Sequence, residues 1–350
     1  MKVISANNVN DAFRKGVDLF RSDLNFRRQE SRNWTTLECI HPVTTVYEKP
    51  WERVLLEKTR DANPFFHLVE AIWMMAGSEN LRQLTHFNDG MKRFSDDGKT
   101  LNGAYGHRWL NTFKLNQIET VVSMLKKDPD SRRCVIQMWN AVKDLNSSSI
   151  DIPCNTNIYF KIREGELQMT VCNRSNDMIW GAYGANVVHM SVLQEYIAAR
   201  LDLPMGKYYQ ISDSFHIYET EQWEKIRLID FGAFYPQRPM YYPKKQIPVV
   251  NHPQTFLYEC KYFLNCLPVD KDLELSIADC NSISWDSFKN GIFPFVIEPM
   301  IKAFTHHKKR DYVESYREIE KIQAEDWQEA AFAWIKKRQL NWEAKHGTGS

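Results

Sequence analysis

The amino-acid sequence predicts a protein of mixed α and β structure that ends in a helical extension. Strand-like runs and helical segments alternate through the first part of the chain, whereas the spacing of apolar residues from residue 298 onward is helical. A stretch rich in Pro, Tyr and Lys lies between the two regions. We therefore expect a main domain over 1–250, a helical extension over 251–346 and a flexible tail over 347–350.

The first strong helix is predicted from Asn63 to Ala76. Asn63 is a suitable N-cap, Pro64 suits the first turn and Gly77 suits the stop. The segment is apolar on nearly every side, which predicts a buried helix. Glu70 lies in its middle and must be paired, hydrogen-bonded or protonated, because burying a bare carboxylate is costly.

The other elements follow from periodicity and turn residues. Apolar residues recur at helical spacing from Asn186 to Leu201, which predicts a core helix packed on a sheet. A turn at 163–166 joins two strand-like runs. The remaining predicted elements are a helix over 115–127 and strands over 132–139, 158–162 and 167–172.

Composition limits the classes of partner and compartment. Across 350 residues, 45 Lys and Arg nearly balance 44 Asp and Glu, and a net charge of +1 gives no general reason to bind a nucleic-acid polymer or an anionic membrane. No long apolar run suggests a signal peptide or a membrane span. The 7 cysteines are scattered without a CxxC pair, which predicts neither disulfides nor a metal site and favours the cytoplasm.

Cys154, in the sequence Pro153-Cys154, is the candidate nucleophile. A thiolate adds readily to the electron-poor C6 of a pyrimidine and makes C5 able to attack an electrophile. A single cysteine is more often a buried structural residue. However, Arg174 lies at the end of a predicted strand, where a guanidinium can lower the pKa of the thiol, and this favours the catalytic interpretation.

The order and spacing of polar residues from 152 to 218 closely resemble the thymidylate synthase superfamily, which includes the deoxypyrimidine-monophosphate hydroxymethylases. The resemblance covers residues 32–218 and implies an α/β (α+β) fold whose large mixed sheet forms the interface of a homodimer. Residues 1–250 would then form the catalytic domain. The matching motifs are Pro153-Cys154, Arg174-Ser175-Asn176-Asp177, Gly181 with Asn186, and Ser214-Phe215-His216-Ile217-Tyr218.

The resemblance implies a set of arginines that hold the nucleotide phosphate. Arg132 and Arg133 match paired arginines that reach across the dimer interface to the partner's substrate, and would otherwise belong to a solvated surface turn. Arg174 matches the arginine that contacts both cysteine and phosphate, and Ser175 adds a hydroxyl. Arg32 resembles a flexible-loop arginine of the same clamp, although the glycines that usually follow it are missing. Several arginines on one dianion form bidentate, charge-assisted hydrogen bonds.

Asn186 matches the residue that reads the base. An amide can donate to O4 and accept from N3–H of uracil, whereas cytosine presents the opposite pattern, which Asp serves. The segment before Asn186 is one residue longer than is usual in the family, and the alternative role of Asn186 is a helix N-cap. His216 and Tyr218 match the pair that holds the 3′-hydroxyl of the sugar.

Three more residues match catalytic or cofactor-binding positions of the family. Glu70 matches the glutamate that organises water and moves protons near O4, and Tyr105 matches the tyrosine linked to removal of the C5 proton. Asp177 matches the carboxylate that faces the pterin, so that Asp177 and Glu70 together are assigned to folate binding. The implied cofactor is 5,10-methylenetetrahydrofolate.

Departures from the family pattern indicate a reaction that ends in capture by water. A tryptophan that flanks the folate in the synthases falls on Met91, Phe94 replaces a second, and the apolar terminus that seals the synthase site gives way to the extension. We therefore predict that an exocyclic methylene, formed on a Cys154–C6 adduct of dUMP, is captured by water. Glu70 would position that water, and the product would be the 5-hydroxymethyl nucleotide.

Three alternatives stay open. If water is excluded, hydride delivery gives thymidylate and the enzyme is a thymidylate synthase. If the extra residue displaces Asn186, the substrate is dCMP. The third alternative is a nucleotide-binding relative that has lost its chemistry, which the joint presence of the predicted catalytic residues disfavours. The family includes phage enzymes that make modified DNA precursors, and the compartment would be the host cytoplasm if the chain is phage-encoded.

Overall fold

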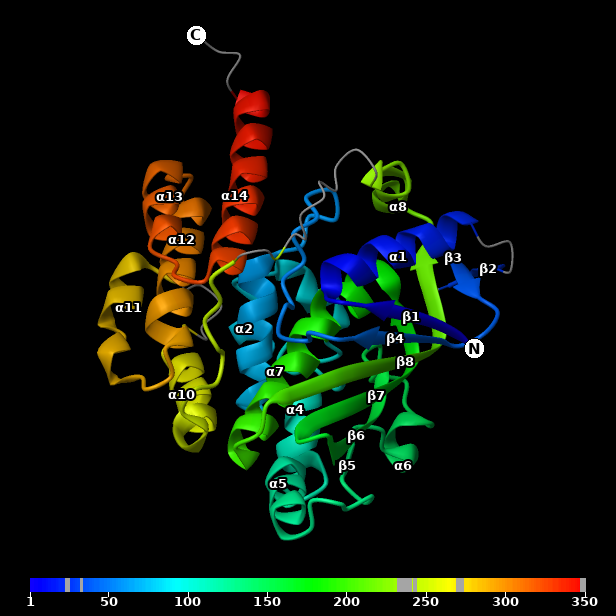
Figure 1. The fold of residues 1–350 in the computed structure, drawn as a ribbon. Helices are drawn as coiled ribbons and strands as arrows, with labels where there is room; N and C mark the ends of the chain where they lie inside the picture. Colours follow the sequence, from blue (N-terminus) through cyan, green and yellow to red (C-terminus); the bar gives the residue numbers. More distant parts are fainter. Residues whose placement is uncertain (23–25, 32–33, 232–240, 242–243, 269–273, 347–350) are drawn as a thin grey trace.

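The computed structural model describes the chain except for residues 23–25, 32–33, 232–240, 242–243, 269–273 and 347–350 (Figure 1). Two sequence predictions fall on these segments. Arg32 and the tail at 347–350 lie outside the described residues.

A mixed sheet of eight strands forms the centre of the fold (Figure 1). Its main path runs β1-β4-β8-β7-β6-β5, while β3 pairs with β8 and β2 with β3. β1 runs parallel to β4 and β7 runs parallel to β8, whereas the other pairs are antiparallel. The strands are β1 (Lys2–Ala6), β2 (Phe26–Glu30), β3 (Thr35–Cys39), β4 (Val43–Tyr47), β5 (Val135–Gln137), β6 (Asn155–Arg163), β7 (Glu166–Asp177) and β8 (Met205–Tyr218).

The parallel pairing of β7 with β8 brings two of the sequence motifs together. In this ladder Ser175 lies opposite Ser214 and Asp177 lies opposite His216. The strands therefore carry the motifs at 174–177 and 214–218 to the same edge of the sheet, although some forty residues separate them along the chain.

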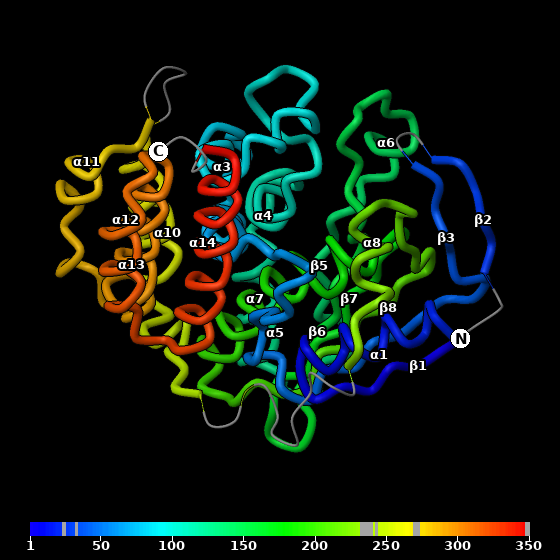
Figure 2. Tube along the Cα trace, turned by 90° about the horizontal axis from the view of Figure 1, so that it is seen from above, coloured from blue at the N-terminus to red at the C-terminus, as the bar shows by residue number. Residues whose placement is uncertain are grey.

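Helices α1 (Val9–Ser22) and α7 (Asn186–Leu201) cover one face of the sheet, and α2 (Pro64–Met75) packs on α7 (Figures 1 and 2). The Asn63 side chain accepts a hydrogen bond from the Phe66 N–H at 3.1 Å, so α2 begins with the predicted cap. Every residue of α2 is buried. The reason is that α2 contacts α7 and also helices of the extension, α10, α12 and α14.

The extension after residue 250 is helical, as predicted. Its aromatic side chains pack directly on α2, since the Phe65 ring lies 5.3 Å from that of Phe304 and 5.5 Å from that of Trp334. The division into domains at residue 250 stays a prediction, but the two parts share this aromatic cluster. The helices of the extension are α10 (Pro253–Asn265), α11 (Ile277–Ser282), η4 (Trp285–Ser287), η5 (Phe293–Ile297), α12 (Glu298–Lys308), α13 (Tyr312–Glu320) and α14 (Glu325–His346).

Most predicted elements are present, with shifted ends. The helix predicted over 115–127 is α5, and the turn before β7 contains Glu164 and Gly165 with φ of 54° and 77°. β7 is longer than predicted because polar residues continue its ladder, whereas β5 is shorter because it pairs only with β6 at the sheet edge. The other helices are α3 (Arg82–Thr85), η1 (Asp89–Phe94), α4 (Tyr105–His107), η2 (Arg108–Thr112), α5 (Gln117–Lys127), α6 (Ala141–Asp144), η3 (Met178–Ala185) and α8 (Glu221–Ile226).

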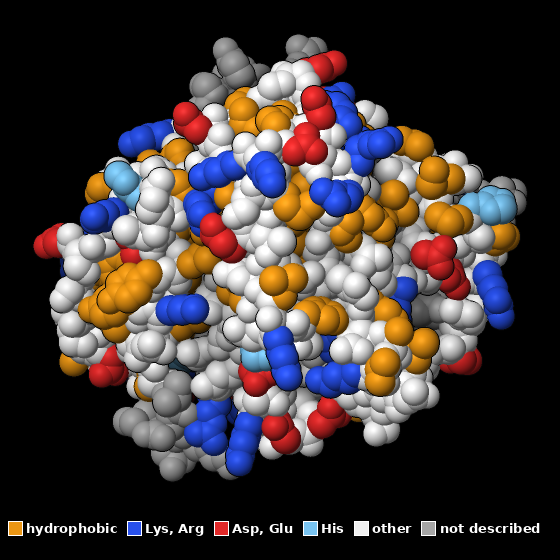
Figure 3. Space-filling model, turned by 90° about the horizontal axis from the view of Figure 1, so that it is seen from below, with side chains coloured by type: hydrophobic (Ala, Val, Ile, Leu, Met, Phe, Trp, Pro, Cys, Tyr) orange, Lys and Arg blue, Asp and Glu red, His pale blue; other side chains and the backbone are white. Residues whose placement is uncertain are grey.

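The second face of the sheet is partly exposed. Buried and half-exposed residues alternate along β7 and β8, and exposed apolar residues on β5 and β6 include Val135 (40%) and Tyr159 (43%). On the side of the molecule seen in Figure 3, basic and acidic side chains are interspersed. Within the described ranges, no helix is long and apolar enough to cross a membrane.

Candidate active site

Cys154 lies just before β6, and the neighbouring strand β7 brings Arg174 against it. The Arg174 N–H donates to the Cys154 carbonyl at 2.9 Å, which links the two backbones. The guanidinium donates to the carbonyl oxygens of Ile152 (3.0 Å) and Pro153 (2.9 Å), and to the Cys154 Sγ at 3.9 Å. Arg174 therefore fixes the loop before the cysteine and places positive charge beside the sulfur. Its Nη1 has no hydrogen-bond partner in the described part of the chain and can take an anion.

Tyr105 holds the same loop from another direction. Its hydroxyl oxygen accepts hydrogen bonds from the N–H groups of Cys154 (3.2 Å) and Asn155 (3.4 Å). Burial raises the pKa of the Tyr105 phenol well above its ordinary value, so the hydroxyl stays protonated. A Cβ on Gly106 would lie 1.8 Å from the Met74 carbonyl oxygen, so only glycine allows this approach of the Tyr105 segment to α2.

Asp151 connects the cysteine loop to the segment that carries Tyr105. Its carboxylate accepts a hydrogen bond from the Gly103 N–H at 2.7 Å, and its carbonyl accepts one from the Asn102 side chain at 2.8 Å. Burial raises the pKa of the Asp151 carboxyl. A Cβ on Gly103 would lie 2.8 Å from this carboxylate. Asp151 therefore links the segment before Cys154 to the segment before Tyr105.

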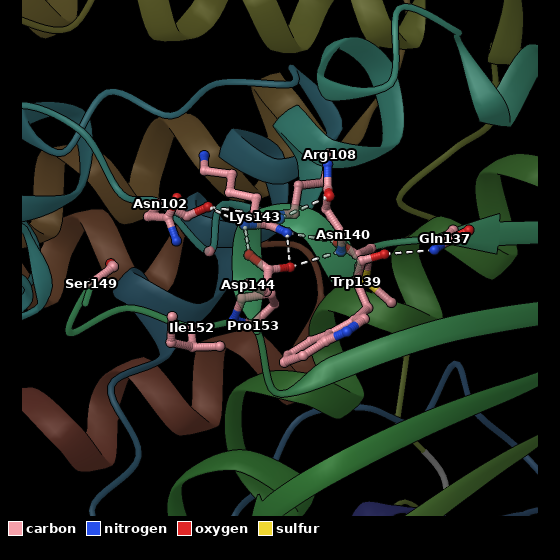
Figure 4. Close-up of polar contacts among 12 residues, drawn as sticks. Asn102, Arg108, Gln137, Trp139, Asn140, Lys143, Asp144, Ser149, Ile152 and Pro153 are labelled. Carbon is pink, nitrogen blue, oxygen red and sulfur yellow. Dashed lines mark hydrogen bonds and ion pairs between the residues drawn. The ribbon is translucent and has the colours of Figure 1, made fainter. Parts of the chain in front are cut away.

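A buried ion pair between Arg108 and Asp144 supports this region (Figure 4). The two side chains are 1% and 0% exposed, and Nη1 and Nη2 of Arg108 reach the two carboxylate oxygens at 2.7 and 2.9 Å. Arg108 also donates to the carbonyl oxygens of Asn102 (2.9 Å) and Met138 (2.8 Å). Through Asn102 the ion pair is therefore joined to Asp151 and the cysteine loop.

Asn186 begins α7, and its amide is oriented by Asn176. Its Nδ2 donates to the Asn176 Oδ1 at 3.1 Å, while the Asn176 Nδ2 donates to the Ser212 Oγ at 3.0 Å. The N-cap of α7 is Ala185, so the alternative role of Asn186 as a cap is not used. One amide N–H and the Oδ1 of Asn186 stay without partners among the described residues, which is the pair of groups that uracil requires.

The extra residue before Asn186 is accommodated within η3. This segment is wound as a π-helix whose first backbone N–H groups are capped by Asp177, with a kink at Gly184. A π turn holds about one residue more than an α turn, so it absorbs a single insertion. A Cβ on Gly181 would lie 2.8 Å from the Asn176 Oδ1, which ties this turn to the orientation of the amide pair. The insertion therefore leaves Asn186 at the start of α7.

Asp177 ends β7 beside the residues predicted to hold the sugar. Its Oδ1 accepts the Trp180 N–H, whereas its Oδ2 is buried with no hydrogen-bond partner in the described ranges. Burial raises the pKa of Asp177, against the opposing charges of His216 and Arg60. A buried acceptor without a donor fits the N–H groups of a pterin ring. The His216 and Tyr218 rings meet edge to face at 5.3 Å, so the structure brings this pair together.

Arg132 and Arg133 lie at the opposite end of β6 from the nucleophile. The Phe160 N–H donates to the Cys134 carbonyl, which places the arginines beside Phe160 and not beside Cys154. Six residues of strand separate Phe160 from Cys154, about 20 Å at the usual rise. Both arginines are exposed. They therefore do not reach Cys154 of their own chain, whereas Ser175 lies on β7 directly after Arg174.

Glu70 faces α7 from the middle of α2. Its Oε2 lies 3.0 Å from the His189 Nε2, and His189 is a residue that the sequence did not single out. Asp151, Arg108, Asp144 and Asn176 were missed as well, because each acts through a contact between segments distant in sequence. For Asn176 a signal existed, since it lies inside the motif at 174–177. Among the described residues, no group of three His, Cys, Asp or Glu could hold a metal ion.

The fold and this arrangement of cysteine, arginine, tyrosine and asparagine define a class of nucleotide-modifying enzyme. The family model described as thymidylate synthase matches residues 28–230, more than half of the chain, and the chain belongs to this family. The fold agrees: the crystal structure of thymidylate synthase from T4 phage is similar with a TM-score of 0.56, covering 72% of this chain and 91% of that one at 19% identity.

Two phage proteins with a more specific description than the family model are also similar to this chain. The chain is 37% identical over 350 residues to the deoxyuridylate hydroxymethyltransferase of Pseudomonas phage M6, covering 99% of this chain and 97% of that protein. It is 39% identical over 198 residues to the deoxyuridylate hydroxymethyltransferase of Bacillus phage SP01, covering 53% of this chain and 52% of that protein. The first match includes the helical extension, which the family model does not reach.

Proposed function

We propose that this chain transfers a hydroxymethyl group to C5 of dUMP. The observation that carries the proposal is the contact at 3.9 Å between the Arg174 guanidinium and the Cys154 Sγ. It occurs in a chain that matches a deoxyuridylate hydroxymethyltransferase over nearly the whole length of both proteins. The protein is therefore a one-carbon transferase whose nucleophile is Cys154.

Cys154 begins the reaction by adding to C6 of the base. The positive charge of Arg174 favours the thiolate form of the cysteine. When Sγ bonds to C6, the electron pair of the C5–C6 double bond moves onto C5 and O4, and C5 becomes a nucleophile. We assign removal of the C5 proton to Tyr105, acting as a neutral hydroxyl that orders a water, because burial disfavours its phenolate.

5,10-Methylenetetrahydrofolate fits the residues present and would supply the one-carbon unit. The unpartnered Oδ2 of Asp177 supports this cofactor, since a pterin offers N–H donors to a buried carboxylate. Glu70 is the second residue that we assign to the folate side of the site.

Capture by water determines which product forms. Once C5 carries the new carbon, loss of the C5 proton with cleavage of the bond from that carbon to the folate nitrogen would leave an exocyclic methylene in conjugation with C4=O. Water bonds to that carbon and its proton passes to Glu70. The displaced electron pair then re-forms the C5–C6 double bond and expels the Cys154 thiolate. The positions of the two synthase tryptophans hold Met91, which packs on the core, and Phe94, which is 38% exposed, and this supports a site open to water.

Asn186 supports dUMP as the substrate in preference to dCMP. Its free amide N–H and Oδ1 match O4 and N3–H of uracil. Cytosine would place a donor against a donor and an acceptor against an acceptor, which costs about 1–3 kcal/mol for each unsatisfied group. The Asn186→Asp variant should therefore gain turnover of dCMP relative to dUMP, with Asn116→Asp, which makes the same change at the N-cap of α5, as a control.

We further propose a homodimer that uses the partly exposed face of the sheet. Arg132 and Arg133 are exposed and lie far from Cys154 of their own chain, so a second copy is the source of substrate that they can reach. The half-exposed residues that alternate along β7 and β8 leave that face available for contact with a second copy. In the partner's site the two arginines, with Arg174 and Ser175, would hold the nucleotide phosphate.

The test is the mass of the nucleotide formed from dUMP or dCMP with methylenetetrahydrofolate. A product heavier than dUMP by one CH₂O unit, formed without oxidation of the folate, supports the proposal. Cys154→Ala should abolish the product, while Cys172→Ala, a half-buried cysteine on β7, should not. A methyl product with dihydrofolate release would make the chain a thymidylate synthase. If neither nucleotide is converted to a product, the alternative of a non-catalytic nucleotide-binding protein remains.

A further inference from the structure

Glu70 and His189 form a buried pair behind the proposed reaction centre. Their nearest atoms, Oε2 and Nε2, are 3.0 Å apart, and the side chains are 10% and 2% exposed. The alignment falls short of a hydrogen bond, so Oε2 of Glu70 and both ring nitrogens of His189 have no hydrogen-bond partner in the part of the chain that the structure describes. A small rotation of the ring would convert this contact into an N–H donation to the carboxylate.

The helices that carry the pair explain its relation to the base. His189 follows Asn186 by three positions on α7, so the two side chains lie on the same side of the helix. Glu70 comes from α2, which packs against α7. The residue that reads the base and the residue that contacts Glu70 therefore project from one helix into one region.

Two other titratable groups interact with this pair: Asp151, on which the charge of Glu70 acts, and His67. His67, one turn before Glu70 on α2, is also buried, and burial with the charges of Arg60 and His189 lowers its pKa well below the ordinary value. His67 is therefore neutral at neutral pH and supplies no charge to Glu70. That leaves His189 as the one described side chain in ion-pair contact with the Glu70 carboxylate.

We propose that His189 is a positioning residue that keeps Glu70 ionised and oriented to accept the proton of the water that captures the exocyclic methylene. This inference rests on the proposed hydroxymethyl transfer. A carboxylate buried without a donor favours its protonated form, which cannot accept a proton from water. An N–H from His189 Nε2 stabilises the charged form and fixes which oxygen stays free for the water. The carboxyl can release its proton again when product leaves.

Two substitutions of His189 distinguish a positioning role from a merely structural one. His189→Leu removes the donor and keeps an apolar side chain, so the acidic limb of the pH–kcat profile should move upward by about one to two pH units, the equivalent of a hydrogen bond to a charged group. His189→Gln retains an amide N–H and should restore most of the wild-type profile. His86→Leu, which removes another histidine with a buried unpartnered nitrogen, should leave the profile in place.

A second readout does not depend on product. The ¹³C signal of the Glu70 carboxyl, assigned with Glu70→Gln, should titrate at higher pH in His189→Leu than in the wild type or in His189→Gln. The inference is wrong if His189→Leu and His189→Gln give the same carboxyl titration and the same pH–kcat profile. It is also wrong if the curves of both variants coincide with those of the wild type. Absence of a hydroxymethyl product in the wild type would instead count against the proposed function, and the carboxyl titration would still be measurable.

Discussion

Replacement of Asp144 by Ala tests how far the Cys154 loop depends on the buried ion pair beneath it. Arg108 makes five hydrogen bonds in the folded protein, two of them to Asp144. With the carboxylate gone, the guanidinium keeps the carbonyl oxygens of Asn102 and Met138, but its buried charge loses the carboxylate that it contacts directly. Removing one partner of a buried pair costs about 3–5 kcal/mol, and the remaining carbonyl contacts place this case near 3 kcal/mol.

The double variant Arg108→Met/Asp144→Leu separates the pair from its surroundings. Both charges are gone, so no uncompensated charge remains, and the loss should be smaller than that of Asp144→Ala alone. Urea unfolding followed by tryptophan fluorescence gives the free energy of unfolding of the wild type and of both variants. The pH adds a second check: burial opposes ionisation of Asp144, but hydrogen bonds from Arg108 and Asn140 bring its pKa below the ordinary 3.8. Its stabilisation is therefore present above about pH 4 and lost as pH falls through the folded-state pKa.

Activity should fall in the same order as stability, with Asp144→Ala the lowest, because Asn102 joins the ion pair to Asp151 and the cysteine loop. The rate at which Cys154 reacts with an alkylating reagent, measured in the folded variants, reports the loop directly. An Asp144→Ala protein with wild-type stability would refute the energetic argument. A destabilised protein whose Cys154 reacts at the wild-type rate would refute the link between the ion pair and the nucleophile.

Three further variants test other parts of the fold. Gly106→Ala should lower activity at least tenfold, since its Cβ would lie 1.8 Å from the Met74 carbonyl oxygen and must push Tyr105 away from Cys154; wild-type turnover would contradict this. Asn63→Ala removes the cap of α2 and should cost about 1 kcal/mol in urea unfolding. Asp326→Asn tests a carboxyl whose pKa burial raises from 3.8 to about 6. The folded wild type binds that proton more tightly than the unfolded chain, so its stability falls as pH rises from about 4 to about 6. The Asp326→Asn variant should therefore be more stable than the wild type by about 1–3 kcal/mol at pH 8, and as stable as the wild type below pH 4.

Local signals in the sequence predicted the elements that depend on them. Asn63 and Pro64 predicted the start of α2, and the apolar spacing from Asn186 predicted both ends of α7. β7 was predicted too short, because the rule that finds strands follows apolar alternation and this strand continues through polar residues. Those residues pair in the ladder while their side chains belong to the candidate site, so the rule that finds strands failed at the candidate site.

The supporting contacts of the site were beyond prediction for a different reason. A sequence does not show that the carboxylate of Asp151 meets the backbone of Gly103, or that Arg108 is buried against Asp144, since each contact joins loops whose approach the whole fold decides. The motif residues were recognised because their order and spacing resemble the thymidylate synthase superfamily. Their supporting partners are common residue types, and only their burial distinguishes them.

The extension acts on the site through α2. A helix that is apolar on every side needs cover on every side, and the helices before residue 250 that contact it, α7, α3 and α4, cover only part of α2. Phe304 and Trp334 of the extension supply the rest by packing on Phe65, five residues before Glu70. The position of Glu70 against His189 thus depends on helices that begin after residue 250. In the proposed reaction, these helices therefore brace α2, which carries the carboxylate that we assign to the capturing water.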